Sequence, residues 1–108
     1  MTDTPQTAVV FVTVPSTEVG EKLAQDIVAG QLAGCVNIVP SVRSVYRWEG
    51  KVCLEAESLL MIKTTHAALP ALERFICDHH PYETPEFVVV GADYVEPRYA
   101  AWIAHAVK

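Results

Sequence analysis

The apolar residues of this chain form two short, uninterrupted runs that are typical of buried strands. The first, AVVFVTV at residues 8–14, is rich in β-branched side chains and is followed by Pro15. The second, FVVVG, lies within residues 85–92. A strand with apolar side chains on both sides of its pleat is usually covered on both faces. The pattern therefore predicts two strands that are each buried on both faces.

A helix is predicted directly after the first of these strands. Ser16 or Thr17 can cap its first turn with a side-chain oxygen, and Gly34 is a natural stop. Apolar residues recur between them at the helical period, which gives the stripe Val19, Leu23, Ile27 and Val28.

Two further helices are predicted in the second half of the chain. One begins between Ala67 and Leu69 and ends before Pro81, and the other opens at residues 96–97 with Glu-Pro. Their apolar stripes are Leu69, Leu72, Ile76 and His79 in the first, and Tyr99, Trp102, Ile103 and Ala106 in the second.

A long hairpin is predicted between the first two helices. The segments CVNIVPSVRSVYRW and KVCLEAESLLMIKT flank Glu49-Gly50, which closes a tight turn, and Pro40 marks a bulge or bend. In the first segment Val42, Ser44, Tyr46 and Trp48 alternate with Arg43, Val45 and Arg47. A strand of roughly 13 residues spans about 40 Å, whereas a compact domain of this length is about 35 Å across. The tip is therefore expected to project beyond the core.

The projecting tip carries Tyr46 and Trp48, which are large side chains to leave in water. An oligomer in which neighbouring subunits cover them is the economical interpretation. We expect Tyr46 and Trp48 to lie in a subunit interface, and interface packing is also the expected role of Trp102.

The predicted elements follow the order strand, helix, strand, then strand, helix, strand, then an added helix. This is the ferredoxin-like split β-α-β order, and it predicts an α+β sandwich with a long projecting hairpin and an added C-terminal helix. We expect residues 1–7 to form a disordered tail and residues 8–108 to form a single domain.

Composition excludes several classes of partner. Thirteen acidic and eight basic side chains give a net charge of -5, and the chain has no Lys/Arg cluster, so nucleic acid is not expected. The apolar run at residues 8–14 is too short to cross a membrane, and a cytoplasmic location is expected. The three cysteines form no C-x-x-C pair, which argues against a disulfide framework and a structural zinc site.

The octapeptide HHPYETPE at residues 79–86 contains half of the histidines of the chain. Neutral imidazole suits Cu(II) and Zn(II), so His79 and His80 are candidate metal ligands, and Pro81 is what allows neighbouring histidines to approach one ion. The alternative for His79 is a partly buried histidine bonded to the backbone. Cys77 and Glu73 on the same helix are further candidate ligands, although a surface thiol without a role is the simpler interpretation of Cys77.

Catalysis has weaker support. A nucleophile at Cys77, a base at His80 and an orienting acid at Glu83 are formally present, but nothing in the sequence supplies an oxyanion hole or a defined pocket. We expect no enzymatic activity and no obligatory cofactor.

Three long motifs, AGCVNIVPSVRSVYRWEGKV, LLMIKT and HHPYETPE, occur in this order and closely resemble the CutA family of divalent-cation tolerance proteins. The resemblance runs from about Val9 to Trp102. It implies a ferredoxin-like subunit, a stable homotrimer whose hairpins pack against neighbouring subunits, and a link to copper and other divalent cations. In some bacterial members copper is assigned to two histidines, here His79 and His80, and to a cysteine whose position is occupied by Val12.

The family also resembles PII-type signalling trimers, which bind small molecules in clefts between subunits. A regulatory or scaffold trimer of this kind is the alternative function. Its candidate ligand residues are Lys63, Arg47, Tyr82 and Glu86, which we expect near subunit clefts and which suit a small anion or a metal complex. The simpler interpretation pairs Lys63 with Glu86 and packs the Tyr82 ring at the helix exit.

Overall fold

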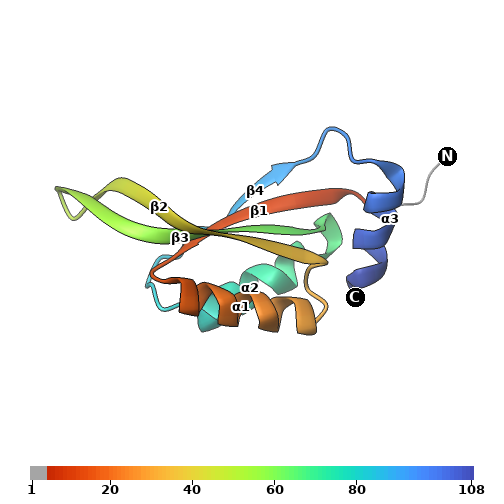
Figure 1. Ribbon diagram of the computed structural model, residues 1–108, viewed down its shortest axis with the longest axis horizontal. Coiled ribbons are helices and arrows are strands. Elements are labelled where there is room, and N and C mark those ends of the chain that lie inside the picture. Colours follow the sequence, from red (N-terminus) through yellow and green to blue (C-terminus); the bar gives the residue numbers. More distant parts are fainter. Residues whose placement is uncertain (1–4) are drawn as a thin grey trace.

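The protein is described by a computed structural model that covers residues 5–108 (Figure 1). The expected disorder of residues 1–4 lies outside the described residues, and the first strand begins at Thr7, inside the predicted tail. The elements in chain order are β1 (Thr7–Val14), α1 (Thr17–Ala29), β2 (Cys35–Trp48), β3 (Lys51–Thr65), the 3₁₀ helix η1 (His66–Ala68), α2 (Leu69–His79), β4 (Val88–Gly91) and α3 (Pro97–Ala106).

The four strands form one antiparallel sheet with the order β2-β3-β1-β4. Helices α1 and α2 cover one face, and α3 lies at the end of the sheet remote from the hairpin tip (Figure 1). The α+β, ferredoxin-like prediction is confirmed. The core lies between the sheet and these two helices, and its fully buried members include Val10, Val12, Ile27, Leu60, Ile62, Leu72 and Ile76.

The prediction that β1 and the FVVVG strand are buried on both faces is wrong for this chain. In β1, every second side chain from Ala8 to Val14 is buried, while Val9, Phe11 and Thr13 on the opposite face are only half-buried. All four residues of β4 are exposed, and β4 is an edge strand that pairs only with β1. Helices α1 and α2 pack on one side of the sheet, and residues 5–108 leave the apolar run in β4 uncovered.

The hairpin prediction is confirmed in detail. Glu49 and Gly50 both have positive φ, 51° and 80°, as a two-residue turn of type I′ requires. The pairing shifts by one residue between Val39 and Val42, which places a bulge at Pro40. The molecule is 50 Å long but only 26 and 22 Å in its other dimensions, and the hairpin forms the projecting end (Figure 1).

The strand register gives the hairpin two different faces. Tyr46 pairs with Cys53, Ser44 with Glu55 and Val42 with Glu57, so these side chains share the inner face with Trp48. The outer face is formed by Arg43, Val45, Arg47, Val52, Leu54 and Ala56. Val45, Val52 and Leu54 are 69%, 70% and 56% exposed, so this outer hairpin face is an uncovered apolar surface.

Helix α1 ends earlier than predicted. Ser16 caps its first turn by accepting a hydrogen bond from the Val19 amide, and Gly30, not Gly34, forms the C-cap. Gly34 has a different role, because a Cβ atom there would lie 2.9 Å from Ile103 Cδ1. A side chain at position 34 would therefore force the buried Ile103 side chain to move, and glycine lets the backbone approach α3 closely.

Candidate functional site

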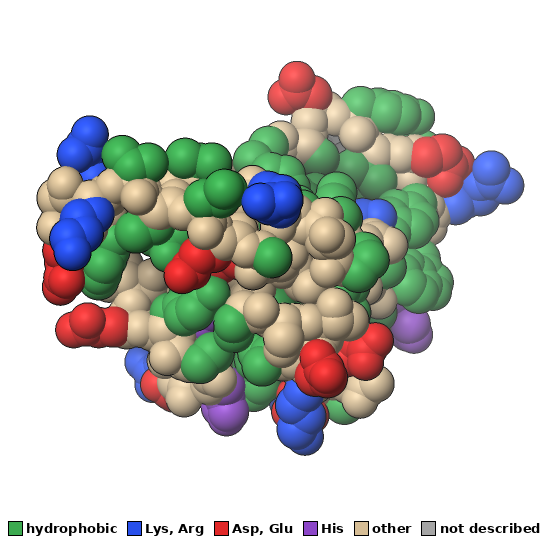
Figure 2. Space-filling model, turned by 60° about the vertical axis from the view of Figure 1, so that its left-hand side comes forward, with side chains coloured by type: hydrophobic (Ala, Val, Ile, Leu, Met, Phe, Trp, Pro, Cys, Tyr) green, Lys and Arg blue, Asp and Glu red, His purple; other side chains and the backbone are tan. Residues whose placement is uncertain are grey.

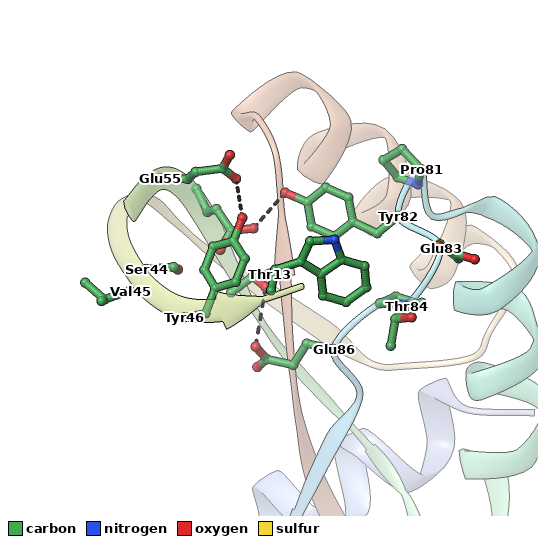
Figure 3. A pocket seen from close by; sticks show the side chains of 13 residues that line it. Thr13, Ser44, Val45, Tyr46, Glu55, Pro81, Tyr82, Glu83, Thr84 and Glu86 are labelled. Atoms are coloured by element: carbon green, nitrogen blue, oxygen red, sulfur yellow. Dashed lines mark hydrogen bonds between the residues drawn. The ribbon is translucent and has the colours of Figure 1, made fainter. Parts of the chain in front are cut away.

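A cleft of about 770 Å³ lies between the inner face of the hairpin and the loop formed by residues 81–86. Tyr46 from β2 and Tyr82 from the loop point toward one another across it (Figure 3). In Figure 2 the surface is hollowed beneath the hairpin, with acidic side chains beside the hollow. The cleft is lined by Thr13, Ser44, Val45, Tyr46, Trp48, Glu55, Glu57, Pro81, Tyr82, Glu83, Thr84, Pro85 and Glu86.

His80 fixes the loop that forms one wall of this cleft. Its ring is buried, and Nε2 donates a hydrogen bond to the Thr13 carbonyl oxygen at 2.8 Å, because a carbonyl can only accept. Nδ1 then carries a lone pair, which accepts the Tyr82 amide N–H at 3.0 Å. His80 is thus a neutral imidazole that ties the loop to β1, and both of its ring nitrogens are occupied.

Two tyrosine–glutamate hydrogen bonds hold the aromatic rings of the cleft in place. Tyr46 Oη donates to Glu55 Oε1 at 2.9 Å, and Tyr82 Oη donates to Glu57 Oε2 at 2.7 Å (Figure 3). The hydrogen bond to Glu55 raises the pKa of Tyr46 to about 12. Burial, followed by the hydrogen bond to Glu57, raises the pKa of Tyr82 well above its ordinary value. Both hydroxyls are therefore protonated donors at neutral pH.

Glu86 closes the lower side of the cleft. Thr13 Oγ1 donates to Glu86 Oε1 at 3.4 Å, a long and weak contact. Burial raises the pKa of the Glu86 carboxyl above its ordinary value, the hydrogen bond from Thr13 opposes this effect, and the charge of Glu57 adds to it. With Glu55 and Glu83 the cleft has four carboxylates, and no Lys, Arg or His side chain is among its lining residues.

His79 and His80 do not present a matched pair of ligands. His79 is exposed, contrary to its predicted place on the buried stripe of α2, and its ring stacks on Phe75 while Nδ1 donates to the Phe75 carbonyl at 2.9 Å. Only its Nε2 lone pair faces water without a partner in the described chain. A metal ion shared by His79 and His80 stays a prediction, and it would require His80 to give up one of its two hydrogen bonds.

The resemblance implied a copper site with a third ligand position, which Val12 occupies in this chain. The Val12 side chain is fully buried between the sheet and the helices. Within residues 5–108, no group of three or more His, Cys, Asp or Glu side chains is placed to hold a metal ion.

The formal catalytic set is not assembled as a reactive unit. Cys77 is exposed on α2, while the two nitrogens of His80 are bonded to Thr13 and Tyr82. His80 is thus not positioned to take a proton from Cys77. Glu83 lines the cleft and makes no contact that would orient the imidazole.

The predicted ligand residues fall into two separate places. Tyr82 and Glu86 line the cleft, but Lys63 does not, and its Nζ lies 5.8 Å from the centre of the Tyr99 ring of α3. Within the described part of one chain, Lys63 is thus not grouped with Tyr82 and Glu86, and no Lys63–Glu86 ion pair is formed. A cleft that these residues share between subunits stays a prediction. Arg47 is on the outer hairpin face, away from the cleft. Tyr46 and Trp48, predicted as interface residues, both line the cleft.

Sequence reasoning missed Thr13, Glu55 and Glu57 as cleft residues. The signal for the two glutamates was present in the predicted hairpin, since pairing across the Glu49-Gly50 turn places Glu55 opposite Ser44. Glu57 is 9% exposed, and such a buried carboxylate is rarely found without a partner. The partner, Tyr82, is 25 residues away in sequence, so only the fold could supply it.

Residues 8–106 match the family described as "CutA1 divalent ion tolerance protein". The chain belongs to the CutA1 family. The prediction made from the three motifs is confirmed. The match spans every described strand and helix except the first residue of β1, so it includes both walls of the cleft.

Members of this family from plants and cyanobacteria are similar to the chain. "Protein CutA 1, chloroplastic" from Oryza sativa is 43% identical over 100 residues, 93% of this chain and 56% of that protein, so the chain spans about half of its length. The crystal structure of Oryza sativa CutA1 is 41% identical, covers 99% of this chain and 98% of that chain, and has a TM-score of 0.96. The "PII-like protein CutA" of Nostoc sp. PCC 7120 is 35% identical, covers 94% and 97%, and has a TM-score of 0.88.

No helix in residues 5–108 combines the length and the apolar character that a membrane crossing requires. The cytoplasmic location stays a prediction.

The two histidines are expected to differ sharply in their contribution to stability. Replacing His80 by alanine leaves the Thr13 carbonyl and the Tyr82 amide without partners, so we expect the free energy of unfolding to fall by about 1–3 kcal/mol. His79→Ala removes an exposed ring and should change it by no more than about 0.5 kcal/mol. Urea denaturation of both variants at one protein concentration measures the difference. Equal losses in the two variants would contradict the conclusion that His80 holds the loop of residues 81–86 against β1.

Proposed function

We propose that this CutA1-family chain forms a homotrimer that contributes to tolerance of divalent cations by binding copper or another divalent metal ion, without catalysing a reaction. The observation that carries the proposal is the match of residues 8–106 to the divalent ion tolerance family. The cytoplasm is the proposed location.

Self-association is supported by the apolar surfaces that the chain leaves uncovered. Val52 and Leu54 on the outer hairpin face and Val88–Val90 on β4 are exposed, and β4 also has an unpaired edge within the described chain. Hydrophobic edge strands are normally protected by pairing or by cover. In a closed ring each subunit contacts two neighbours through two different surfaces. Copies of the same chain could therefore cover the outer hairpin face and β4 together.

Metal binding is supported more weakly, and His79 carries the argument. Its Nδ1 donates to the Phe75 carbonyl, so Nε2 is the ring nitrogen that is left to bind a metal ion such as Cu(II) or Zn(II). Cys77 and Asp78 are exposed in the same turn of α2. An open site with one fixed imidazole agrees with reversible binding and with the absence of an obligatory cofactor.

Calorimetric titration with CuCl₂ tests the metal role. His79→Ala should weaken Cu(II) binding by roughly tenfold or more. His105→Ala is the matched control, because His105 is also an exposed histidine in the last turn of a helix, on α3. The metal role is contradicted if all variants bind Cu(II) like the wild type, or if His105→Ala loses as much affinity as His79→Ala.

The second candidate function is a PII-like regulatory trimer that binds a small ligand. The observation that favours it is the cleft itself, whose volume of about 770 Å³ lies in the range of small-molecule sites. The Nostoc neighbour is named as a PII-like protein, which agrees with this alternative. In this case the two tyrosines of the cleft contact the ligand and metal binding at His79 is incidental.

A further inference from the structure

The hairpin loses its support on one side at Ser58. This residue is the last one of β3 that pairs with β1, where its partner is Val14. From Glu57 to the turn, β3 pairs with β2 alone within residues 5–108, so the projecting part of the hairpin is a two-stranded ribbon (Figure 1). Such ribbons twist more strongly than wider sheets and are only marginally stable on their own. The direction of the ribbon must therefore be fixed where it joins the sheet.

The bulge of β2 lies at the same point. Between the pairs Val39–Leu59 and Val42–Glu57, β2 has two residues while β3 has only Ser58. A bulge of this kind leaves one residue outside the pairing, bends the strand and increases its local twist. The junction is therefore the place at which the ribbon can turn relative to the sheet.

Hydroxyl groups hold this junction to helix α1. Ser58 Oγ donates to the Pro40 carbonyl oxygen of the bulge at 3.0 Å, and it lies 3.1 Å from Oγ1 of Thr17, the first residue of α1. A serine hydroxyl has one proton to donate, so in the second contact Thr17 is the donor and Ser58 Oγ accepts. Thr17 Oγ1 is also 3.5 Å from the Pro40 carbonyl oxygen, a long and weak contact. We call these three groups the hydroxyl anchor.

The hydroxyl anchor belongs to the interior of the chain. Ser58 is 1% exposed, and contact with other copies can only reduce this fraction. Water therefore cannot replace its hydrogen bonds, and a buried polar group without a partner is unfavourable. The hydroxyl anchor is thus present in the single chain and in an assembly alike.

The length of the ribbon amplifies any change at its root. Ser58 is seven residues from Lys51 at the turn, which at about 3.4 Å per residue is about 24 Å. A rotation of about 10° at the root would move the tip by about 4 Å over this length. Such a displacement is as large as the distance that defines a contact between apolar side chains. Val52 and Leu54 would then miss the neighbouring surface that they fit in the proposed trimer.

We propose that the hydroxyl anchor sets the direction in which the hairpin projects, and that Ser58 and Thr17 are positioning residues for assembly of the trimer. The inference rests on the proposed function, in which a neighbouring subunit covers the outer hairpin face. It adds the interior groups that decide whether the hairpin reaches that neighbour. Because ordering a flexible segment on association is unfavourable, a hairpin that is directed in advance associates more strongly.

Distances between two spin labels test the direction of the hairpin. In a chain whose three cysteines are replaced by alanine, Lys51→Cys places one label near the turn and Gln25→Cys places the other on the exposed side of α1. Labelled chains are diluted with unlabelled ones, so that an assembly contains one labelled chain. Ser58→Ala with Thr17→Val removes both hydroxyls, and we expect its distance distribution to shift or broaden by at least about 4 Å.

Sedimentation over a range of chain concentrations tests the effect on assembly. The variant without the two hydroxyls should associate at least about tenfold more weakly than the wild type, whereas Thr17→Ser keeps a hydroxyl and should assemble normally. Thr64→Val is the matched control, because Thr64 also has a buried hydroxyl on β3, which donates to the Leu32 carbonyl at 2.7 Å. Thr64 lies at the end of β3 that is remote from the hairpin turn. We therefore expect this control to lower the stability of the chain but to leave the label distances and the association unchanged.

The outcomes separate the hydroxyl anchor from the trimer on which it acts. If removal of both hydroxyls leaves the label distances unchanged, the hydroxyl anchor does not direct the hairpin. If Thr64→Val has the same effects, they come from a general loss of stability and the inference is wrong. If the distances change but the association does not, the role in assembly is wrong. If the wild-type chain is a monomer at every concentration, the proposed trimer fails, and the label distances still decide whether the hydroxyl anchor directs the hairpin.

Discussion

Replacing Leu60 by alanine is expected to lower the free energy of unfolding by about 2–5 kcal/mol. Leu60 lies on β3 with no exposed surface, in the layer between the sheet and the two covering helices. Truncation removes three buried carbon atoms and leaves a cavity that the strand, paired on both sides with β1 and β2, cannot close by moving. Denaturation by guanidinium chloride, followed by circular dichroism, measures the loss.

Val28→Ala is the comparison for this change, because Val28 is an aliphatic side chain that is 41% exposed on α1. It should cost no more than about 0.5 kcal/mol. Both variants and the wild type are compared at one chain concentration, since association contributes to the apparent stability of an oligomer. A loss below about 1 kcal/mol for Leu60→Ala would mean that the core is not organised around β3 as described.

Placing lysine on the outer hairpin face is expected to disassemble the proposed trimer. Val52 and Leu54 are exposed in the single chain, and in the proposed assembly they are covered by a neighbouring subunit. Burying two ammonium groups without partners costs several kcal/mol. Val52→Lys with Leu54→Lys should therefore weaken association by at least about a thousandfold, which corresponds to about 4 kcal/mol. Sedimentation should show a change from three chains to a single chain of 11.9 kDa.

Val28→Lys introduces one lysine at an exposed apolar position of α1, away from the hairpin, and should leave the trimer intact. Circular dichroism checks that each chain remains folded. If the hairpin variant is still a trimer, the outer hairpin face is not part of the interface. If the wild-type chain sediments as a monomer, the proposed trimer is wrong.

The candidate functions depend on different parts of the molecule, which makes them separable by experiment. His79 stands alone on the last turn of α2, whereas the cleft is formed by β2, β3 and the loop after α2. Loss of copper binding in His79→Ala would leave the cleft intact. His80 is the residue that must be left unchanged in such tests, because it holds the loop that carries Tyr82.

The fold could be predicted from sequence wherever local chemistry decides it. The turn at Glu49-Gly50 follows from a glycine that tolerates positive φ, the bulge from Pro40, and the start of α1 from the hydroxyl of Ser16. Each of these signals acts over only a few residues. The end of α1 was predicted wrongly at Gly34, because Gly30 forms the C-cap, while Gly34 packs against Ile103.

The candidate site could be predicted only in part. The octapeptide was singled out from its composition as a candidate site, and Tyr82 and Glu86 do line the cleft. Sequence alone could not tell which histidine is buried, because His79 lies in helical geometry while His80 has ψ of 139° and turns back toward β1. It could not place Lys63 either, because Lys63 lies near the end of β3 that is remote from the hairpin turn, where its Nζ faces the Tyr99 ring of α3.

The sequence by itself determined the order of the elements, the register of the hairpin and the family, because these depend on periodicity and on motifs that are continuous along the chain. Tertiary structure alone decided that the second face of the sheet is uncovered, that His80 is tied to Thr13, and that four carboxylates and three aromatic rings share one cleft. The reason is physical: these contacts join segments tens of residues apart, and their geometry exists only after the sheet and its two helices have packed.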